Sequence, residues 1–128
     1  MNVILSIKPE FADAILSGIK TVEFRKALFK KKVDKVFIYC SSPVKKIIGY
    51  FTFNEIVRDT PQNLWQRFSQ HGFIDEISFF KYFENKDIGF SICIKSVNQF
   101  STSIDPYEVI DKFTPPQSFI YYKGIIGE

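Results

Sequence analysis

The sequence lacks several features that would assign it to a large class of proteins. It has two cysteines, Cys40 and Cys93, and no C-x-x-C pair, so no zinc or redox motif is indicated. No apolar run approaches the roughly 20 residues of a membrane helix. The apolar stretch after Met1 is too short for a secretory signal peptide and has no basic residue before it. We therefore expect a cytoplasmic protein without membrane contact, whose two thiols are free and buried.

Residues that hold metals or cofactors are also scarce. The chain has one histidine, His71, which precedes Gly72 at the end of an expected helix and has no evident serine or cysteine partner. There is no glycine-rich phosphate loop and no cluster of metal ligands. We expect no metal and no cofactor, and we interpret His71 as a solvated residue at a helix end.

Aromatic residues are abundant. The 128 residues include fifteen phenylalanines, with 45% hydrophobic and 24% charged residues overall. This balance is typical of a globular chain, and the length suits one domain over residues 1–128. Much of the core is therefore expected to be aromatic.

Positive charge is concentrated in the first half of the chain. Residues 1–64 hold eleven basic and six acidic side chains, a net charge of +5, whereas residues 65–128 have a net charge of −2. The densest basic run extends from Arg25 to Lys35, with only Asp34 opposing it. Such a run attracts phosphates, although a solvated loop made soluble by lysine would have the same composition.

The hydrophobic pattern predicts an α+β chain with about six strands. These strands are expected at residues 3–7, 20–26, 35–40, 46–56, 88–97 and 118–123. Helices are expected from Pro9 to Gly18, around Trp65 up to Gly72, and over 75–83, with a helical turn or two in 105–112. Short strands in a small chain tend to close into a barrel, which removes exposed edges. We therefore expect a small β-barrel with flanking helices.

Three charged residues follow one another closely after the first helix. Gly18 ends that helix, and Lys20, Glu23 and Arg25 follow within one short strand. By strand alternation, Glu23 and Arg25 share one face, about 7 Å apart, and face away from Val22. The alternative to a ligand site is an ion pair on the surface, which contributes about 0–1 kcal/mol.

The pattern G-x-K-x-x-E-x-R formed by residues 18–25 resembles the signature of the ASCH domain family in the PUA-like superfamily. Several other segments resemble stand-alone bacterial and phage members of that family in the same order. They are residues 4–9 (ILSIKP), 38–43 (IYCSSP), 49–51 (GYF), the helix containing Trp65, and 115–119 (PPQSF). The resemblance covers most of the chain.

The resemblance implies a PUA-like β-barrel with a cleft between the barrel and the helices. Members of the family are regarded as RNA-binding or coactivator-like modules, some act as amidohydrolases on acylated cytidine, and some have been linked to RNA cleavage. Lys20 matches the lysine of the amidohydrolases, but Glu23 occupies the position of their threonine nucleophile. A carboxylate there would raise the pKa of Lys20 and keep this lysine charged, which suits a phosphate anchor better than a base. We expect little hydrolysis of acylated cytidine.

The first hypothesis is a module that binds RNA, another single-stranded nucleic acid or a nucleotide-like ligand, with a regulatory role in transcription or translation. The expected binding residues are Lys8, Lys20, Glu23, Arg25, Lys26, Ser41 and Ser42. The second hypothesis is a hydrolase acting on a modified nucleoside or on RNA, either an amidohydrolase or a ribonuclease, with Lys20 and Glu23 as its acid–base groups. A third is a protein-interaction module that uses the aromatic helical segment. The choice between RNA and DNA and the oligomeric state stay open.

Overall fold

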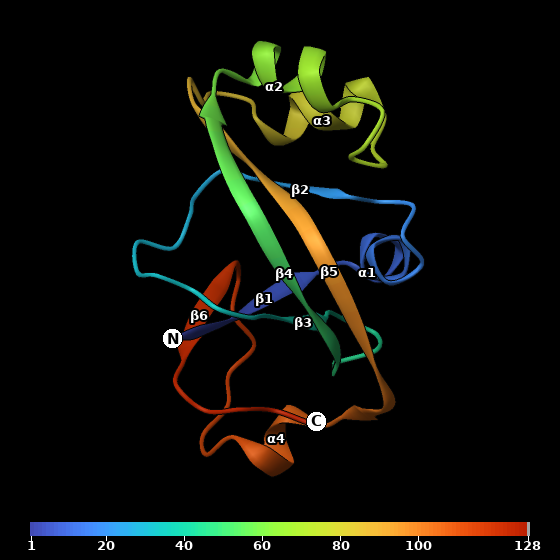
Figure 1. The fold of residues 1–128 in the computed structure, drawn as a ribbon, viewed down its shortest axis with the longest axis vertical. Helices are drawn as coiled ribbons and strands as arrows, with labels where there is room; N and C mark the ends of the chain where they lie inside the picture. The colour runs from blue at the N-terminus through green and yellow to red at the C-terminus, as the bar shows by residue number, and fades with distance from the viewer. Residues whose placement is uncertain (128) are drawn as a thin grey trace.

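The fold is built on one six-stranded sheet, seen in a computed structural model that describes residues 1–127. The strand order is β2-β5-β4-β3-β1-β6, with β1 and β3 parallel and every other pair antiparallel. The strands are β1 (Asn2–Ile7), β2 (Val22–Arg25), β3 (Val36–Cys40), β4 (Lys46–Asp59), β5 (Gly89–Ile104) and β6 (Phe119–Tyr122). The sheet is curled, and β2 and β6 form its two edges (Figure 1).

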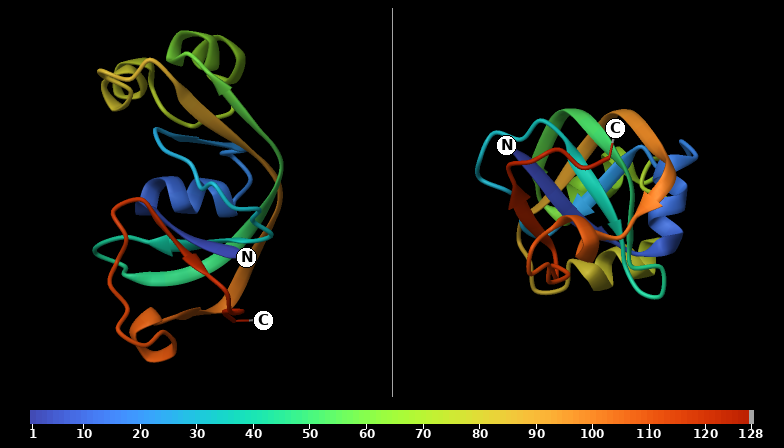
Figure 2. Two further views of the ribbon diagram at one scale, coloured as in Figure 1. Left: turned by 90° about the vertical axis from the view of Figure 1, so that its left-hand side faces the viewer. Right: turned by 90° about the horizontal axis from the view of Figure 1, so that it is seen from below.

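Two long strands produce the curl. β4 and β5 run for 14 and 16 residues, longer than the stretches 46–56 and 88–97 expected from the sequence. They bend around the concave side of the molecule (Figure 2, left). Their pairing shifts register at three places, and such bulges bend and twist a strand pair. Near the first shift, Gly49 lies so close to the Asn98 carbonyl that a Cβ atom would overlap it. The expected strands are all present, and the sheet that they form is a curled half-barrel.

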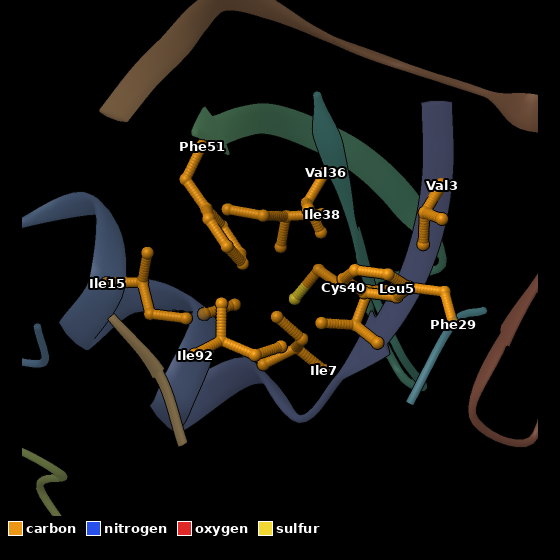
Figure 3. Packing of buried hydrophobic residues seen from close by; sticks show 11 residues of the cluster. Val3, Leu5, Ile7, Ile15, Phe29, Val36, Ile38, Cys40, Phe51 and Ile92 are labelled. Atoms are coloured by element: carbon orange, nitrogen blue, oxygen red, sulfur yellow. The ribbon is translucent and has the colours of Figure 1, made fainter. Parts of the chain in front are cut away.

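An apolar core fills the concave side of this half-barrel. Every residue of β3 is buried, as are most residues of β1. Figure 3 shows the packing of Val3, Leu5, Ile7, Ile15, Phe29, Val36, Ile38, Cys40, Phe51 and Ile92. Both cysteines are free, and Cys40 is buried as expected, whereas Cys93 is half-buried.

Four helices flank the sheet: α1 (Pro9–Leu16), α2 (Pro61–Phe68), α3 (Glu76–Tyr82) and α4 (Pro106–Val109). The side chains of Thr60 and Asp75 cap the N-termini of α2 and α3 by accepting hydrogen bonds from backbone N–H groups. α4 is one turn, within the range of one or two turns expected in 105–112, and Lys112 adopts a positive φ beyond it. No helix within residues 1–127 is long and apolar enough to cross a membrane.

Candidate functional site

The short strand β2 separates an apolar layer from a charged one. Val22 and Phe24 pack against the helical segment, in a cluster with Leu64, Phe68, Phe79 and Phe83. Glu23 and Arg25 lie on the other face of the strand, as the alternation predicts. Both Val22 and Glu23 are buried, so the strand is enclosed on both sides.

Lys20 is buried where the chain enters β2. Its side chain is 3% exposed, and Nζ lies 3.4 Å from Oε1 of Glu23. Nζ also donates a hydrogen bond to the Gly72 carbonyl oxygen. The rings of Phe11 and Phe24 lie within 5.6 Å of the ammonium group. Since Glu23 is buried as well, the alternative of a surface ion pair is wrong.

The segment around Gly72 is held against the start of β2. The His71 carbonyl accepts hydrogen bonds from the backbone N–H groups of Thr21 and Val22, at 2.9 and 3.2 Å. A Cβ atom at Gly72 would overlap the Phe24 ring, so only glycine allows this close approach. His71 itself is exposed and contributes its backbone rather than its ring, in agreement with a solvated histidine at a helix end.

Arg25 connects the two edges of the half-barrel. Its Nη1 lies 2.9 Å from Oε2 of Glu23 and donates to the Ser6 carbonyl of β1 at 3.3 Å. Its Nη2 donates to Oγ of Ser118, the residue before β6, at 3.0 Å. The remaining donor, Nε, is buried and has no hydrogen-bond partner within the described residues. The Glu23 carboxylate thus lies between two cations, the Lys20 ammonium and the Arg25 guanidinium.

Burial lowers the pKa of Lys20 below its ordinary value of 10.5. Loss of water around the ammonium is the largest cause, and the Glu23 carboxylate opposes it only in part. The sequence led us to expect the opposite direction, because the charge of Glu23 is visible in the sequence and the burial of Lys20 is not. The direction of the shift makes the uncharged form of Lys20 easier to reach than in a solvated lysine.

These charges face a cleft of about 500 Å³. Of the seven expected binding residues, the cleft is lined by Lys8, Lys20, Glu23, Arg25 and Ser41. The structure does not bring the other two into its lining. Ser42 is exposed in the turn after β3, and Nζ of Lys26 lies 4.7 Å from the centre of the Tyr82 ring at the margin of the cleft.

The aromatic helical segment serves mostly as core. Phe79 and Phe83 are buried, and the Trp65 ring packs 4.9 Å from that of Phe79. Tyr82 differs, because it is half-buried and lines the cleft together with one side of Phe79. Its hydroxyl accepts a hydrogen bond from the backbone N–H of Lys26 at 3.1 Å, and burial raises its pKa.

Sequence reasoning missed several polar residues at the cleft. They are Ser6, Glu10, Ser78 and Gln117, which line it, and Ser118, which holds Arg25. They come from three separate stretches of the chain, so no local spacing could have joined them. The PPQSF segment was the one available signal for Gln117 and Ser118. No group of three or more histidine, cysteine or acidic residues in 1–127 is placed to hold a metal ion.

Comparison with known proteins identifies the family and the fold. Residues 5–116 match the family described as ASCH domain. A protein of Zymomonas mobilis named ASCH domain-containing ribonuclease is 32% identical over 123 residues, which cover 94% of this chain and 83% of that protein. The crystal structure of ASCH from Zymomonas mobilis superposes with a TM-score of 0.88 at 31% identity, covering 95% of this chain and 87% of the other. A mutant of the Zymomonas mobilis protein gives a TM-score of 0.89 at 30% identity, with coverages of 95% and 90%. The curled sheet and its helices are therefore a PUA-like fold of the ASCH type.

Proposed function

This chain belongs to the ASCH domain family, and we propose that its cleft binds single-stranded RNA and cleaves the phosphodiester backbone. The observation that carries the proposal is Lys20, a buried lysine of lowered pKa that lines the cleft. A relative that is 32% identical over nearly the whole chain bears the name ribonuclease, which supports the same reaction class.

The cleft offers cations at two depths for an RNA strand. Lys8 lies exposed at its mouth, and Arg25 and Lys20 lie inside it. The expected nucleic-acid-binding residues remain part of the proposal, with Ser41 as a hydrogen-bond donor to a phosphate and Lys26 and Ser42 outside the lining. The basic stretch of residues 26–35 leaves the end of β2 and adds attraction that does not depend on base sequence.

The chemistry assigned to Lys20 is proton transfer. A lysine accepts a proton near neutral pH only when its pKa falls, and desolvation is the usual means. In the proposed reaction the uncharged form of Lys20, which its lowered pKa makes easier to reach, takes the proton of a ribose 2′-hydroxyl, the 2′-oxygen bonds to phosphorus, and the bond from phosphorus to the 5′-oxygen breaks. The products are a 2′,3′-cyclic phosphate and a 5′-hydroxyl. We assign the proton for the leaving 5′-oxygen to the phenol of Tyr82, which lines the cleft and whose pKa is raised by burial.

A second candidate function is RNA binding without cleavage, in the regulatory role that the family resemblance implies. One observation favours it: Lys20 donates to the Gly72 carbonyl and pairs with Glu23, contacts that suit a protonated ammonium. A charged Lys20 would anchor a phosphate. Hydrolysis of acylated cytidine is the weaker enzymatic candidate, because the Glu23 carboxylate stands at the threonine position and is engaged by both cations.

Incubation with an end-labelled single-stranded RNA distinguishes these functions. We expect the wild type to release fragments ending in a 2′,3′-cyclic phosphate, and Lys20→Met to bind the RNA without cleaving it. Lys95→Met, at an exposed lysine of β5 outside the cleft lining, is the matched control and should cleave normally. A DNA strand of the same sequence should stay intact, because it lacks the attacking hydroxyl. Binding without cleavage by the wild type would favour the regulatory module, and absence of both would refute the RNA function.

A further inference from the structure

Phe73 is an exposed aromatic residue next in the chain to the cleft residue Ile74, and it has no part in the charge arrangement described above. Phe73 follows Gly72, whose carbonyl accepts the Lys20 ammonium, and precedes Ile74, which lines the cleft. We propose that Phe73 is a stacking platform for one unpaired base of the RNA strand, so that the site selects single-stranded over duplex RNA. This inference rests on the proposed function and specifies the form of RNA that the cleft accepts.

The exposure of Phe73 contrasts with the surrounding phenylalanines. Phe73 is 47% exposed, whereas Phe24, Phe68, Phe79 and Phe83 nearby are all buried. An isolated exposed apolar side chain is common on protein surfaces. Here, however, Phe68 and Phe79, which flank Phe73 in the sequence, both belong to one buried aromatic cluster, and Phe73 lies outside that cluster.

The backbone at Phe73 adopts a strained conformation. Its φ is +51°, in the left-handed region that bulky side chains rarely adopt. Such conformations persist where the surrounding structure imposes them, and they are concentrated at ligand sites. Glycine or asparagine would adopt this turn with less strain, so the turn itself does not require a phenylalanine.

The segment that carries Phe73 is fixed at both ends. On one side, the His71 carbonyl is bonded to the start of β2, and the His71 N–H donates to the Phe68 carbonyl at 2.9 Å. On the other side, the Asp75 carboxylate accepts hydrogen bonds from both the backbone N–H and the hydroxyl of Ser78, each at 2.8 Å. A ring held on a rigid segment loses little conformational freedom on stacking.

The position beside Lys20 identifies a nucleobase as the occupant. Phe73 is one residue from the carbonyl that holds Lys20, so a strand with a phosphate at the cleft cations has an adjoining base near the rim. Single-strand binding sites combine such a positive groove with aromatic rings on which bases stack. In a duplex, bases are already stacked on their neighbours and cannot occupy the ring.

Binding of RNA by Phe73 variants tests the proposal. A fluorescent single-stranded RNA of twelve uridines and a duplex of equal length serve as probes. We expect Phe73→Ala to weaken binding of the single strand about tenfold, in the range that alanine substitution produces at stacking sites. Phe73→Trp should retain binding, and the tryptophan fluorescence of this variant should be quenched when RNA binds. Tyr107→Ala is the matched control, because Tyr107 is an aromatic residue 54% exposed on α4, away from the cleft lining.

A second probe separates stacking from other effects. In a strand of the same length whose bases are removed, the sugar–phosphate backbone remains, so Phe73→Ala should bind it as the wild type does. If Phe73→Ala binds and cleaves the uridine strand like the wild type, the platform is refuted and the RNA function stands. An equal loss on both strands would also refute stacking and indicate a disturbed cleft. If the wild type binds neither the uridine strand nor the strand without bases, the RNA function is refuted, and the stacking role of Phe73 is refuted with it.

Discussion

The concave side of the half-barrel and the cleft beside β2 are built on the same sheet, yet they are opposite in character. The half-barrel core consists of apolar side chains from β1, β3, α1 and β4 (Figure 3). The cleft contains Lys20 and Glu23, which are as well buried as many core residues. Apolar burial stabilises the fold directly, whereas burial of two charges carries a desolvation penalty that their attraction only partly offsets.

The desolvation penalty of the buried charges therefore falls on the cleft and not on the apolar core. Well-packed apolar residues in place of a buried ion pair are often neutral or stabilising. Shifted pKa values and strained backbone are concentrated at functional sites. The cleft contains Lys20, whose pKa is lowered, and Phe73, one of four non-glycine residues of 1–127 with a positive φ, precedes the cleft residue Ile74 in the chain. The proposed function assigns the cleft to an RNA ligand and leaves folding to the core, so substitutions should affect the two regions differently.

The largest effect on stability is expected from a cavity in the core. Phe51 is fully buried in the half-barrel, and Phe51→Ala should lower the free energy of unfolding by about 3–5 kcal/mol. Denaturant titration measures this loss. If the variant is still folded, its RNA affinity should match that of the wild type; a loss of affinity in proportion to the lost stability would break the separation between core and cleft.

A smaller loss of stability is expected from removal of the shared carboxylate in the cleft. Glu23→Gln leaves Lys20 and Arg25 as neighbouring buried cations without a counter-charge, which should destabilise the protein by about 3 kcal/mol. The control is Glu55→Gln, since Glu55 pairs with Arg67 at 3.7 Å with both side chains more than half exposed. That change should stay within about 1 kcal/mol. Equal effects of the two substitutions would contradict a buried pair.

The sequence predicted the parts of this comparison that depend on local pattern. Alternation along residues 20–26 placed Glu23 and Arg25 on one face, and the motif with Lys20 indicated the family, which the comparisons confirm. The sequence did not reveal the burial of Lys20, because that depends on Phe11 of α1 and on Gly72, far along the chain. It also missed Ser118, whose link to Arg25 spans 93 positions. The length of β5 was underestimated because most residues of its last part are exposed and polar, and β4 extends three residues beyond the expected 56 to pair with the start of β5.

A smaller effect is expected when Lys20 loses its proton, and it should appear in the pH dependence of the free energy of unfolding. Because the folded state has the lower pKa, the unfolded chain binds more protons between that pKa and 10.5, and stability should rise with pH across this window. Below the folded pKa the penalty of the buried charge is fully present. Lys20→Met should lack the rise when both proteins are titrated with denaturant at a series of pH values. Parallel curves would mean that the pKa of Lys20 is not lowered.

The smallest change is expected at the basic stretch outside the cleft. Replacement of Lys30, Lys31 and Lys32 by serine should reduce the salt dependence of RNA binding, by a slope of about 0.7 for each phosphate that these lysines neutralise in the wild type. The backbone N–H groups of Lys30 and Lys31 bond to the Tyr121 hydroxyl and are unchanged by this substitution. Only the exposed cation–π contact of Lys31 with the Tyr121 ring is lost, so stability should fall by no more than about 1 kcal/mol. Titrations at several salt concentrations measure the slope. An unchanged slope would assign RNA attraction to the cleft cations alone.

The most direct test of the account is the pH dependence of RNA cleavage by the wild type and by Lys20→Met, corrected for cleavage without protein. If Lys20 is the proton acceptor, the wild-type rate rises with pH and levels off at a pKa below 10.5, and the variant shows no such limb while it still binds RNA. Cleavage by folded Lys20→Met at the wild-type rate, with the same pH profile, would contradict the assignment of the cleft chemistry to Lys20.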